Sequence, residues 1–124
     1  MNTGKLLVID DEGIVRTSCK RVLSPEGYEV RLAANAFEGV KMLEEEKFDV
    51  VLTDLKMPDM DGISVLRTIK EKWPETQVIV ITGYQTVDTA VKSIKLGAFD
   101  YIEKPFTPDA LLAAVASALD SKKS

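Results

Sequence analysis

Five short apolar runs alternate with five segments of helical spacing, and this alternation constrains the fold more than any other feature of the chain. The runs cover residues 6–9, 28–32, 48–53, 78–82 and 99–102. Several are apolar throughout, which is typical of strands covered by helices on both faces. The second run is partly polar and is expected at a sheet edge. Strict alternation of strands and helices predicts a doubly wound α/β domain with a five-stranded parallel sheet.

The segments between these runs carry apolar residues at helical spacing. The residues are Ile14, Val15, Cys19, Val22 and Leu23; Phe37, Val40 and Leu43; Val65, Leu66 and Ile69; Val87, Ala90, Val91 and Ile94; and Leu111, Leu112, Val115 and Leu119. Asn35 followed by Glu38 resembles a capped helix start, and the second set is expected on one face of that helix. Gly97 is expected as a helix C-cap, and Thr107 and Pro108 as the start of the last helix.

Composition limits the classes of function. The 124 residues suit one domain, expected over residues 1–120, with residues 121–124 as a polar tail or linker stub. A net charge of −4 argues against direct binding of nucleic acid, which needs a basic face. No apolar run approaches the roughly 20 residues of a membrane span, so no membrane association is expected. The chain has no histidine, and its one cysteine, Cys19, suits a reducing cytoplasm.

Polar residues of a particular kind follow the predicted strands. Asp10 and Asp11 come after the first strand and Asp54 after the third, while Thr82 ends the fourth and Lys104 follows the fifth. Ligands of open parallel sheets bind beyond the carboxyl ends of the strands. If the first and third strands are neighbours, three carboxylates meet there and require a cation, because two charges about 4 Å apart repel by about 4 kcal/mol at a dielectric near 20. Oxygen ligands without His or Cys favour Mg²⁺.

Each of these residues also has an ordinary structural use. Asp10 and Asp11 could cap the first helix, Thr82 could cap a loop, and Lys104 could be a surface lysine. Only their joint position at successive strand ends indicates a site for a metal and a phosphoryl group.

Four segments together resemble a known family. VIDDEG, VVLTDLKMPDMDG, VIVITGY and YIEKPF are similar in order and spacing to the receiver domain of bacterial two-component response regulators, especially the nitrogen-regulator-like group. The resemblance covers residues 5 to about 119. It implies a flavodoxin-like fold with strand order 2-1-3-4-5, in which the first and third strands are neighbours.

The resemblance also implies roles at the proposed metal site. Asp54 would be the phosphoacceptor, attacking a phosphohistidine on a partner protein. Asp10, Asp11 and Asp54 would hold Mg²⁺ with the backbone carbonyl of Lys56. The chain would not be an enzyme with a turned-over substrate but a phosphoacceptor that assists its own phosphotransfer and dephosphorylation.

Further roles follow from the same resemblance. Lys104 would pair with phosphoryl oxygens, and the Thr82 hydroxyl would donate to one of them. Tyr101 would turn inward on activation and alter the surface of the fourth helix, fifth strand and fifth helix. Lys56 and Tyr84 occupy the positions that tune phosphoryl lifetime in relatives, and both side chains could equally point to solvent.

The resemblance implies a sensor histidine kinase and a downstream effector as partners. The effector is expected to be transcriptional by the similarity to the nitrogen-regulator-like group, and a homodimer is expected on phosphorylation. A phosphate-independent docking or dimerisation module stays open as the alternative. Two other readings fit less well. A haloacid-dehalogenase phosphatase is suggested by Asp59 to Gly62, but the register after the strand is wrong. A flavodoxin-like electron carrier would need a Ser/Thr/Gly phosphate loop after the first strand, where this chain has acids that would repel the FMN phosphate.

Overall fold

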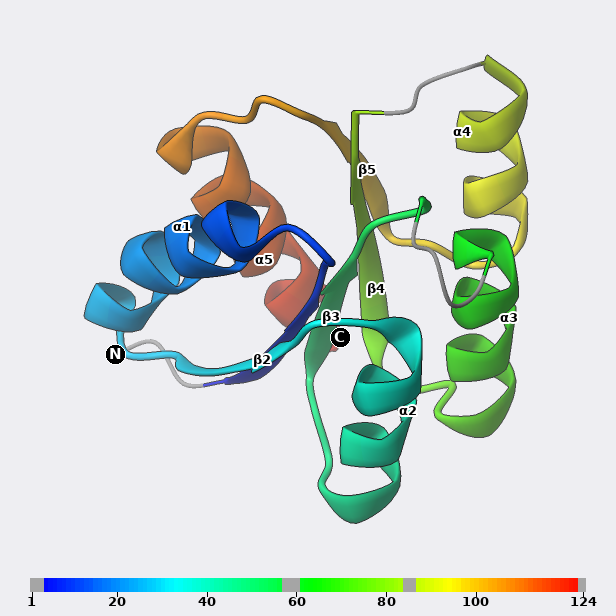
Figure 1. The fold of residues 1–124 in the computed structure, drawn as a ribbon, viewed down its shortest axis with the longest axis horizontal. Helices are drawn as coiled ribbons and strands as arrows, with labels where there is room; N and C mark the ends of the chain where they lie inside the picture. The colour runs from blue at the N-terminus through cyan, green and yellow to red at the C-terminus, as the bar shows by residue number, and fades with distance from the viewer. Residues whose placement is uncertain (1–3, 57–60, 84–86, 123–124) are drawn as a thin grey trace.

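The computed structural model describes residues 4–56, 61–83 and 87–122, without the Val87 side chain. Strands and helices alternate along the chain, with one short 3₁₀ helix after α1 (Figure 1). The elements are β1 (Lys5–Ile9), α1 (Gly13–Leu23), η1 (Ser24–Glu26), β2 (Glu29–Ala33), α2 (Ala36–Glu45), β3 (Val50–Thr53), α3 (Gly62–Lys72), β4 (Gln77–Thr82), α4 (Val87–Lys95), β5 (Asp100–Glu103) and α5 (Pro108–Lys122).

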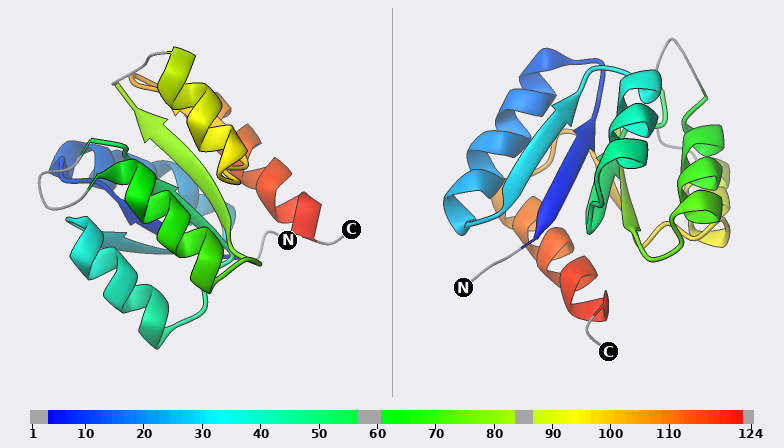
Figure 2. Two further views of the ribbon diagram at one scale, coloured as in Figure 1. Left: turned by 90° about the vertical axis from the view of Figure 1, so that its right-hand side faces the viewer. Right: turned by 90° about the horizontal axis from the view of Figure 1, so that it is seen from below.

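The strands form one parallel sheet in the order β2-β1-β3-β4-β5, which confirms the expected fold class. Helices α1 and α5 cover one face, and α2, α3 and α4 cover the other (Figures 1 and 2). Strands β1 and β3, buried except at Lys5, lie side by side at the centre, with Ile9 in register with Thr53. The carboxyl ends of these two strands therefore open at the same place on the sheet edge.

Several helix ends follow the local signals. The Asn35 side chain accepts a hydrogen bond from Glu38 N at 2.8 Å, which confirms the capped start of α2. Gly97 has a left-handed φ of 106°, as expected for a residue after a helix end. The Thr107 hydroxyl accepts from Ala110 N at 3.1 Å at the start of α5. Helix α5 continues to Lys122, past the boundary expected at residue 120.

The prediction that Phe37 lies on the apolar face of α2 is wrong, because its side chain is 73% exposed. The helix instead turns Ala36, Gly39 and Leu43 to the sheet. A Cβ on Gly39 would lie 2.4 Å from Ile9 Cδ1, so the helix approaches the sheet too closely for a large residue there. Small residues therefore set the rotation of α2, and Phe37 points away from the core.

Helix α4 differs from the apolar pattern in the same way. Val91 and Ile94 are exposed, while Ser93 is fully buried. The Ser93 hydroxyl donates to the Thr89 carbonyl at 2.8 Å, so a satisfied polar group takes an inward position. Across the described ranges, no helix is long and apolar enough to span a membrane.

Candidate functional site

Asp10 and Asp54 occupy neighbouring positions at the carboxyl edge of the sheet. Asp54 N donates to the Ile9 carbonyl at 3.1 Å, which continues the β1–β3 pairing to the end of β3. Asp10 N donates to the Ala33 carbonyl at 3.1 Å on the other side. Both acids are buried. The backbone of the central strands thus fixes where the two carboxylates stand.

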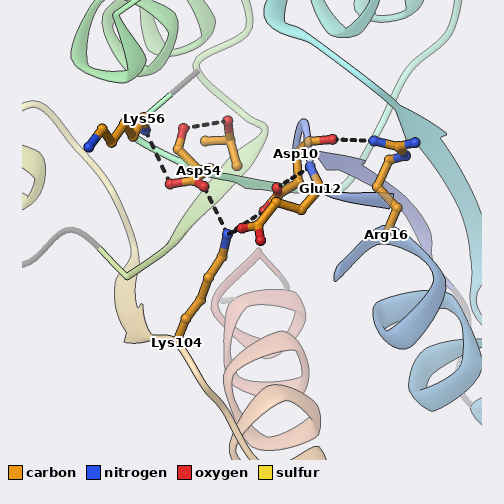
Figure 3. A network of polar contacts seen from close by, with 7 residues as sticks. Asp10, Glu12, Arg16, Asp54, Lys56 and Lys104 are labelled. Atoms are coloured by element: carbon orange, nitrogen blue, oxygen red, sulfur yellow. Dashed lines mark hydrogen bonds and ion pairs between the residues drawn. The ribbon is translucent and has the colours of Figure 1, made fainter. Parts of the chain in front are cut away.

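Lys104, the residue directly after β5, contacts both carboxylates. Its Nζ lies 2.9 Å from Asp10 Oδ2, 2.7 Å from Glu12 Oε1 and 2.8 Å from Asp54 Oδ2 (Figure 3). Its backbone N donates to the Thr82 carbonyl at 3.0 Å, so the start of the β5–α5 connection is held against the end of β4. The structure therefore brings together side chains that follow the first, third and fifth strands.

Burial and charge act against each other in this cluster. Burial raises the pKa of Asp10 above its usual range, although a hydrogen bond from Glu12 N and the charge of Lys104 oppose the rise. Burial lowers the pKa of Lys104, but its hydrogen bonds to Asp54, Glu12 and Asp10 outweigh burial and hold that pKa above its ordinary value. Lys104 is therefore a firmly protonated ammonium among acids.

The acids of the cluster form a donor set suited to a hard cation. Asp10, Asp11, Glu12 and Asp54 each offer a carboxylate oxygen, and these oxygens lie within 4.8 Å of one another. One ammonium offsets only one of four negative charges when all four acids are ionised. Oxygen-only ligands match the preference of Mg²⁺ and Ca²⁺. The residues present thus fit a divalent cation.

The two residues expected to form the switch lie on adjacent strands. Thr82 is fully buried at the end of β4, beside Glu103 in the β4–β5 register. Tyr101 on β5 is half-buried, and its hydroxyl lies 3.4 Å from the Thr89 hydroxyl of α4. The Tyr101 hydroxyl therefore already contacts the helix whose surface this residue is expected to control.

Of the two residues expected to tune phosphoryl lifetime, the structure describes Lys56 but not Tyr84. Lys56 N donates to Asp54 Oδ1 at 3.1 Å. The exposed side chain of Lys56 points away from Asp54 (Figure 3). Tyr84 lies outside the described residues, as does the segment 57–60.

Two residues of the site were missed by reasoning from the sequence. Glu12 contacts Lys104, and Arg16 donates through Nη1 to the Asp10 carbonyl at 2.7 Å. Glu12 directly follows the acidic pair, and Arg16 lies one helical turn further on. Their closeness in sequence was visible, but an acid and a base at a helix start are common on surfaces.

A groove of about 370 Å³ opens beside the cluster. Its lining combines charged residues of the site with apolar residues of α1 and of the segment before α5: Glu12, Ile14, Val15, Ser18, Lys104, Pro105 and Phe106. Ile14 is exposed there. A partner protein that reached the acids would meet this apolar surface.

The sequence matches the model of the response regulator receiver domain over residues 6–116. The DNA-binding transcriptional regulator NtrC of Proteus hauseri is 40% identical over 119 residues, which are 96% of this chain and 25% of that relative. The chain thus spans about a quarter of the length of the curated relatives that it matches.

Solved structures agree with the fold. A receiver domain protein (CheY-like) from Methanospirillum hungatei superposes with a TM-score of 0.94 and 37% identity, and the match covers 98% of both chains. The beryllofluoride-activated NtrC4 receiver domain dimer gives a TM-score of 0.91 and 41% identity, covering 95% of this chain and 98% of that one.

Proposed function

Since the chain belongs to the response regulator receiver domain family, whose members are phosphorylation-activated switches, we propose that Asp54 accepts a phosphoryl group from a sensor histidine kinase. The observation that carries this proposal is the position of Lys104 Nζ, 2.8 Å from Asp54 Oδ2 and 2.9 Å from Asp10 Oδ2. Phosphoryl transfer depends chiefly on positioning and on charge compensation at the phosphoryl oxygens. A fixed ammonium beside the nucleophile supplies both.

The Asp54 carboxylate is the nucleophile. Its oxygens accept hydrogen bonds from Lys56 N at 3.1 Å and from Lys104 Nζ at 2.8 Å, which fix its orientation. One oxygen attacks phosphorus in line with the phosphohistidine nitrogen of the kinase. The new O–P bond forms as the P–N bond breaks, and the imidazole keeps the electron pair. The chain thereby assists its own phosphorylation, and the same groups assist hydrolysis of the acyl phosphate.

Mg²⁺ is the proposed cofactor. Asp10, Asp11 and Asp54 would hold it, together with the Lys56 backbone carbonyl. The grouping of carboxylate oxygens within 4.8 Å supports this assignment. When bound, the ion supplies positive charge that stabilises the phosphoryl oxygens during transfer.

The proposed switch links the phosphoryl group to α4. The Thr82 hydroxyl moves to donate a hydrogen bond to a phosphoryl oxygen. The Tyr101 ring then turns further inward, into the space that Thr82 has left. The contact between the Tyr101 and Thr89 hydroxyls supports this route. The surface of α4, β5 and α5 then changes, as expected for a two-state element biased by a local charge. Lys56 and Tyr84 are proposed to tune how long the phosphoryl group persists.

The proposed partners use two different surfaces. The kinase docks on the groove beside the acids, where the exposed Ile14 and the half-buried Phe106 offer apolar contacts. The α4, β5 and α5 surface controls a downstream effector, and the full-length relative named as a DNA-binding transcriptional regulator supports a transcriptional one. A homodimer on phosphorylation is supported by the similar activated receiver dimer. The buried free thiol of Cys19 supports a cytoplasmic setting.

Intact-mass measurement after incubation with acetyl phosphate and Mg²⁺ tests the proposed function. The parent protein should gain one phosphoryl group, and Asp54→Asn should gain none. A parent protein that never gains the adduct would instead support a phosphate-independent docking or dimerisation module.

A further inference from the structure

The geometry points to Glu12 as a restraint on phosphorylation: its ion pair with Lys104 must open before Lys104 can pair with a phosphoryl group on Asp54. This inference rests on the proposed function and adds a residue to it. It concerns how readily the site accepts a phosphoryl group, not whether it does.

The hydrogen-bonding capacity of Lys104 is already full. A lysine ammonium has three N–H donors and no acceptor. The Nζ of Lys104 has three carboxylate partners, at 2.9 Å to Asp10, 2.7 Å to Glu12 and 2.8 Å to Asp54. A phosphoryl oxygen can therefore gain a hydrogen bond from Lys104 only if one of these partners leaves.

Glu12 is the partner that can leave at the lowest cost. Its side chain is 54% exposed, whereas that of Asp10 is 2% exposed. A carboxylate at the surface regains water when its ion pair opens, so exposed ion pairs are weak. The other oxygen of Asp10, Oδ1, accepts a hydrogen bond from Glu12 N at 2.9 Å, and this bond anchors the Asp10 side chain in the loop. Asp54 keeps its full charge until transfer, so its carboxylate does not release Lys104 to an incoming phosphoryl group.

The orientation of Glu12 is not explained by helix capping. Glu12 is the N-cap residue of α1, where a side chain commonly accepts a hydrogen bond from a helix amide. Within the described part of the chain, its side chain caps no helix amide and reaches across to Lys104 instead. Replacing the Glu12 carboxylate should therefore leave α1 intact while releasing Lys104.

The rate of phosphorylation by acetyl phosphate with excess Mg²⁺ tests the inference. In this reaction the Asp54 O–P bond forms, the donor P–O bond breaks and acetate leaves with the electron pair. Glu12→Gln should react roughly two- to fivefold faster than the parent, the range set by an exposed ion pair. Glu12→Asp, which keeps the charge but is shorter by one methylene, should also react faster.

Three further measurements separate the restraint from other effects. The gain should shrink in about 1 M salt, where the Debye length is about 3 Å. Dephosphorylation should be unchanged, because Glu12 has already released Lys104 in the phosphorylated state. Glu45→Gln serves as the control and should match the parent in every assay, because Glu45 is an exposed acid at the C-terminal end of α2.

Equal phosphorylation rates for the parent and Glu12→Gln would overturn this inference alone. A slower Glu12→Gln with a weaker affinity for Mg²⁺ by calorimetry would also overturn it, because Glu12 would then be a metal ligand. Absence of any adduct on the parent protein would remove the proposed function, and this inference with it.

Discussion

The ammonium of Lys104 lies 2.8 Å from Asp54 Oδ2, although 50 residues separate them in the sequence. This contact links the loop that follows β5 to the end of β3, across the intervening strand β4. Because Lys104 also holds Asp10 and Glu12, one side chain balances charge contributed by two other loops. Loss of this cation should therefore affect both stability and phosphorylation.

Lys104→Met should lower the free energy of unfolding by about 2 kcal/mol without Mg²⁺. This is less than the 3–5 kcal/mol of a fully buried ion pair, since the cluster borders solvent. Saturating Mg²⁺ should recover part of the loss, because a ligand that binds only the folded state stabilises it. Urea unfolding with and without Mg²⁺ measures both effects. The exposed Lys41→Met serves as the control, and an equal loss in the two variants would contradict the expectation.

Thr82→Ala should accept a phosphoryl group yet fail to transmit it. The lost hydrogen bond to a charged oxygen is worth about 1.5–3 kcal/mol, so the switch equilibrium should shift by roughly tenfold or more. Tyr101→Phe should weaken the same response, because its hydroxyl no longer meets Thr89. Amide chemical shifts of α4 with and without beryllofluoride report the switch. Thr82→Ser should retain it, and a normal response in Thr82→Ala would exclude this route.

Ile14→Ala should slow phosphotransfer from the kinase while leaving reaction with acetyl phosphate unchanged. The exposed Ile14 side chain lines the groove, and truncating an apolar anchor at an interface commonly costs more than 1 kcal/mol. Parallel rate measurements with both donors separate docking from chemistry. Phe37→Ala removes an equally exposed apolar residue outside the groove and should match the parent. A loss with both donors would place the effect in the chemistry instead.

Stability should fall more steeply with alkaline pH in the parent than in Cys19→Ala. Burial raises the pKa of the Cys19 thiol to about 12, from an ordinary value of 9.0. Above pH 9 the unfolded chain loses this proton while the folded chain keeps it, so stability falls by about 1.4 kcal/mol per pH unit up to the folded pKa. Urea unfolding at pH 8 and pH 10 measures the difference. Parallel slopes in the two proteins would show that burial leaves this thiol unperturbed.

Gly62→Ala should destabilise the protein by about 2–3 kcal/mol. A Cβ at this position would lie 2.2 Å from Leu55 Cα and 2.4 Å from the Leu55 carbonyl oxygen, so backbone would have to move. Thermal unfolding measures the loss. Gly13→Ala provides the matched control, because its Cβ would meet only Arg16 Nη2 at 3.5 Å. That variant should be neutral or more stable by up to about 1 kcal/mol, and equal losses would refute the close approach.

The side chains expected at the site lie together where strand ends alone determine their position, and their roles stay predictions. Asp10, Asp54 and Lys104 follow their strands directly, so placing the strands also placed these side chains. Glu12 and Arg16 were missed because their roles depend on side-chain direction across loops. Tyr84 lies outside the described residues, and its role stays a prediction.

The sequence by itself determined the order of strands and helices, their approximate limits and the fold class. These properties follow from hydrophobic period and capping residues, which act over a few neighbouring positions. The tertiary structure decided the rotation of α2 that exposes Phe37, and the convergence of Glu12 with Lys104 across 92 residues. The neighbouring positions of β1 and β3 followed from family resemblance and not from the alternation. Contacts of this kind depend on how closely helices approach the sheet and which strands pair, and only packing of the whole chain decides both.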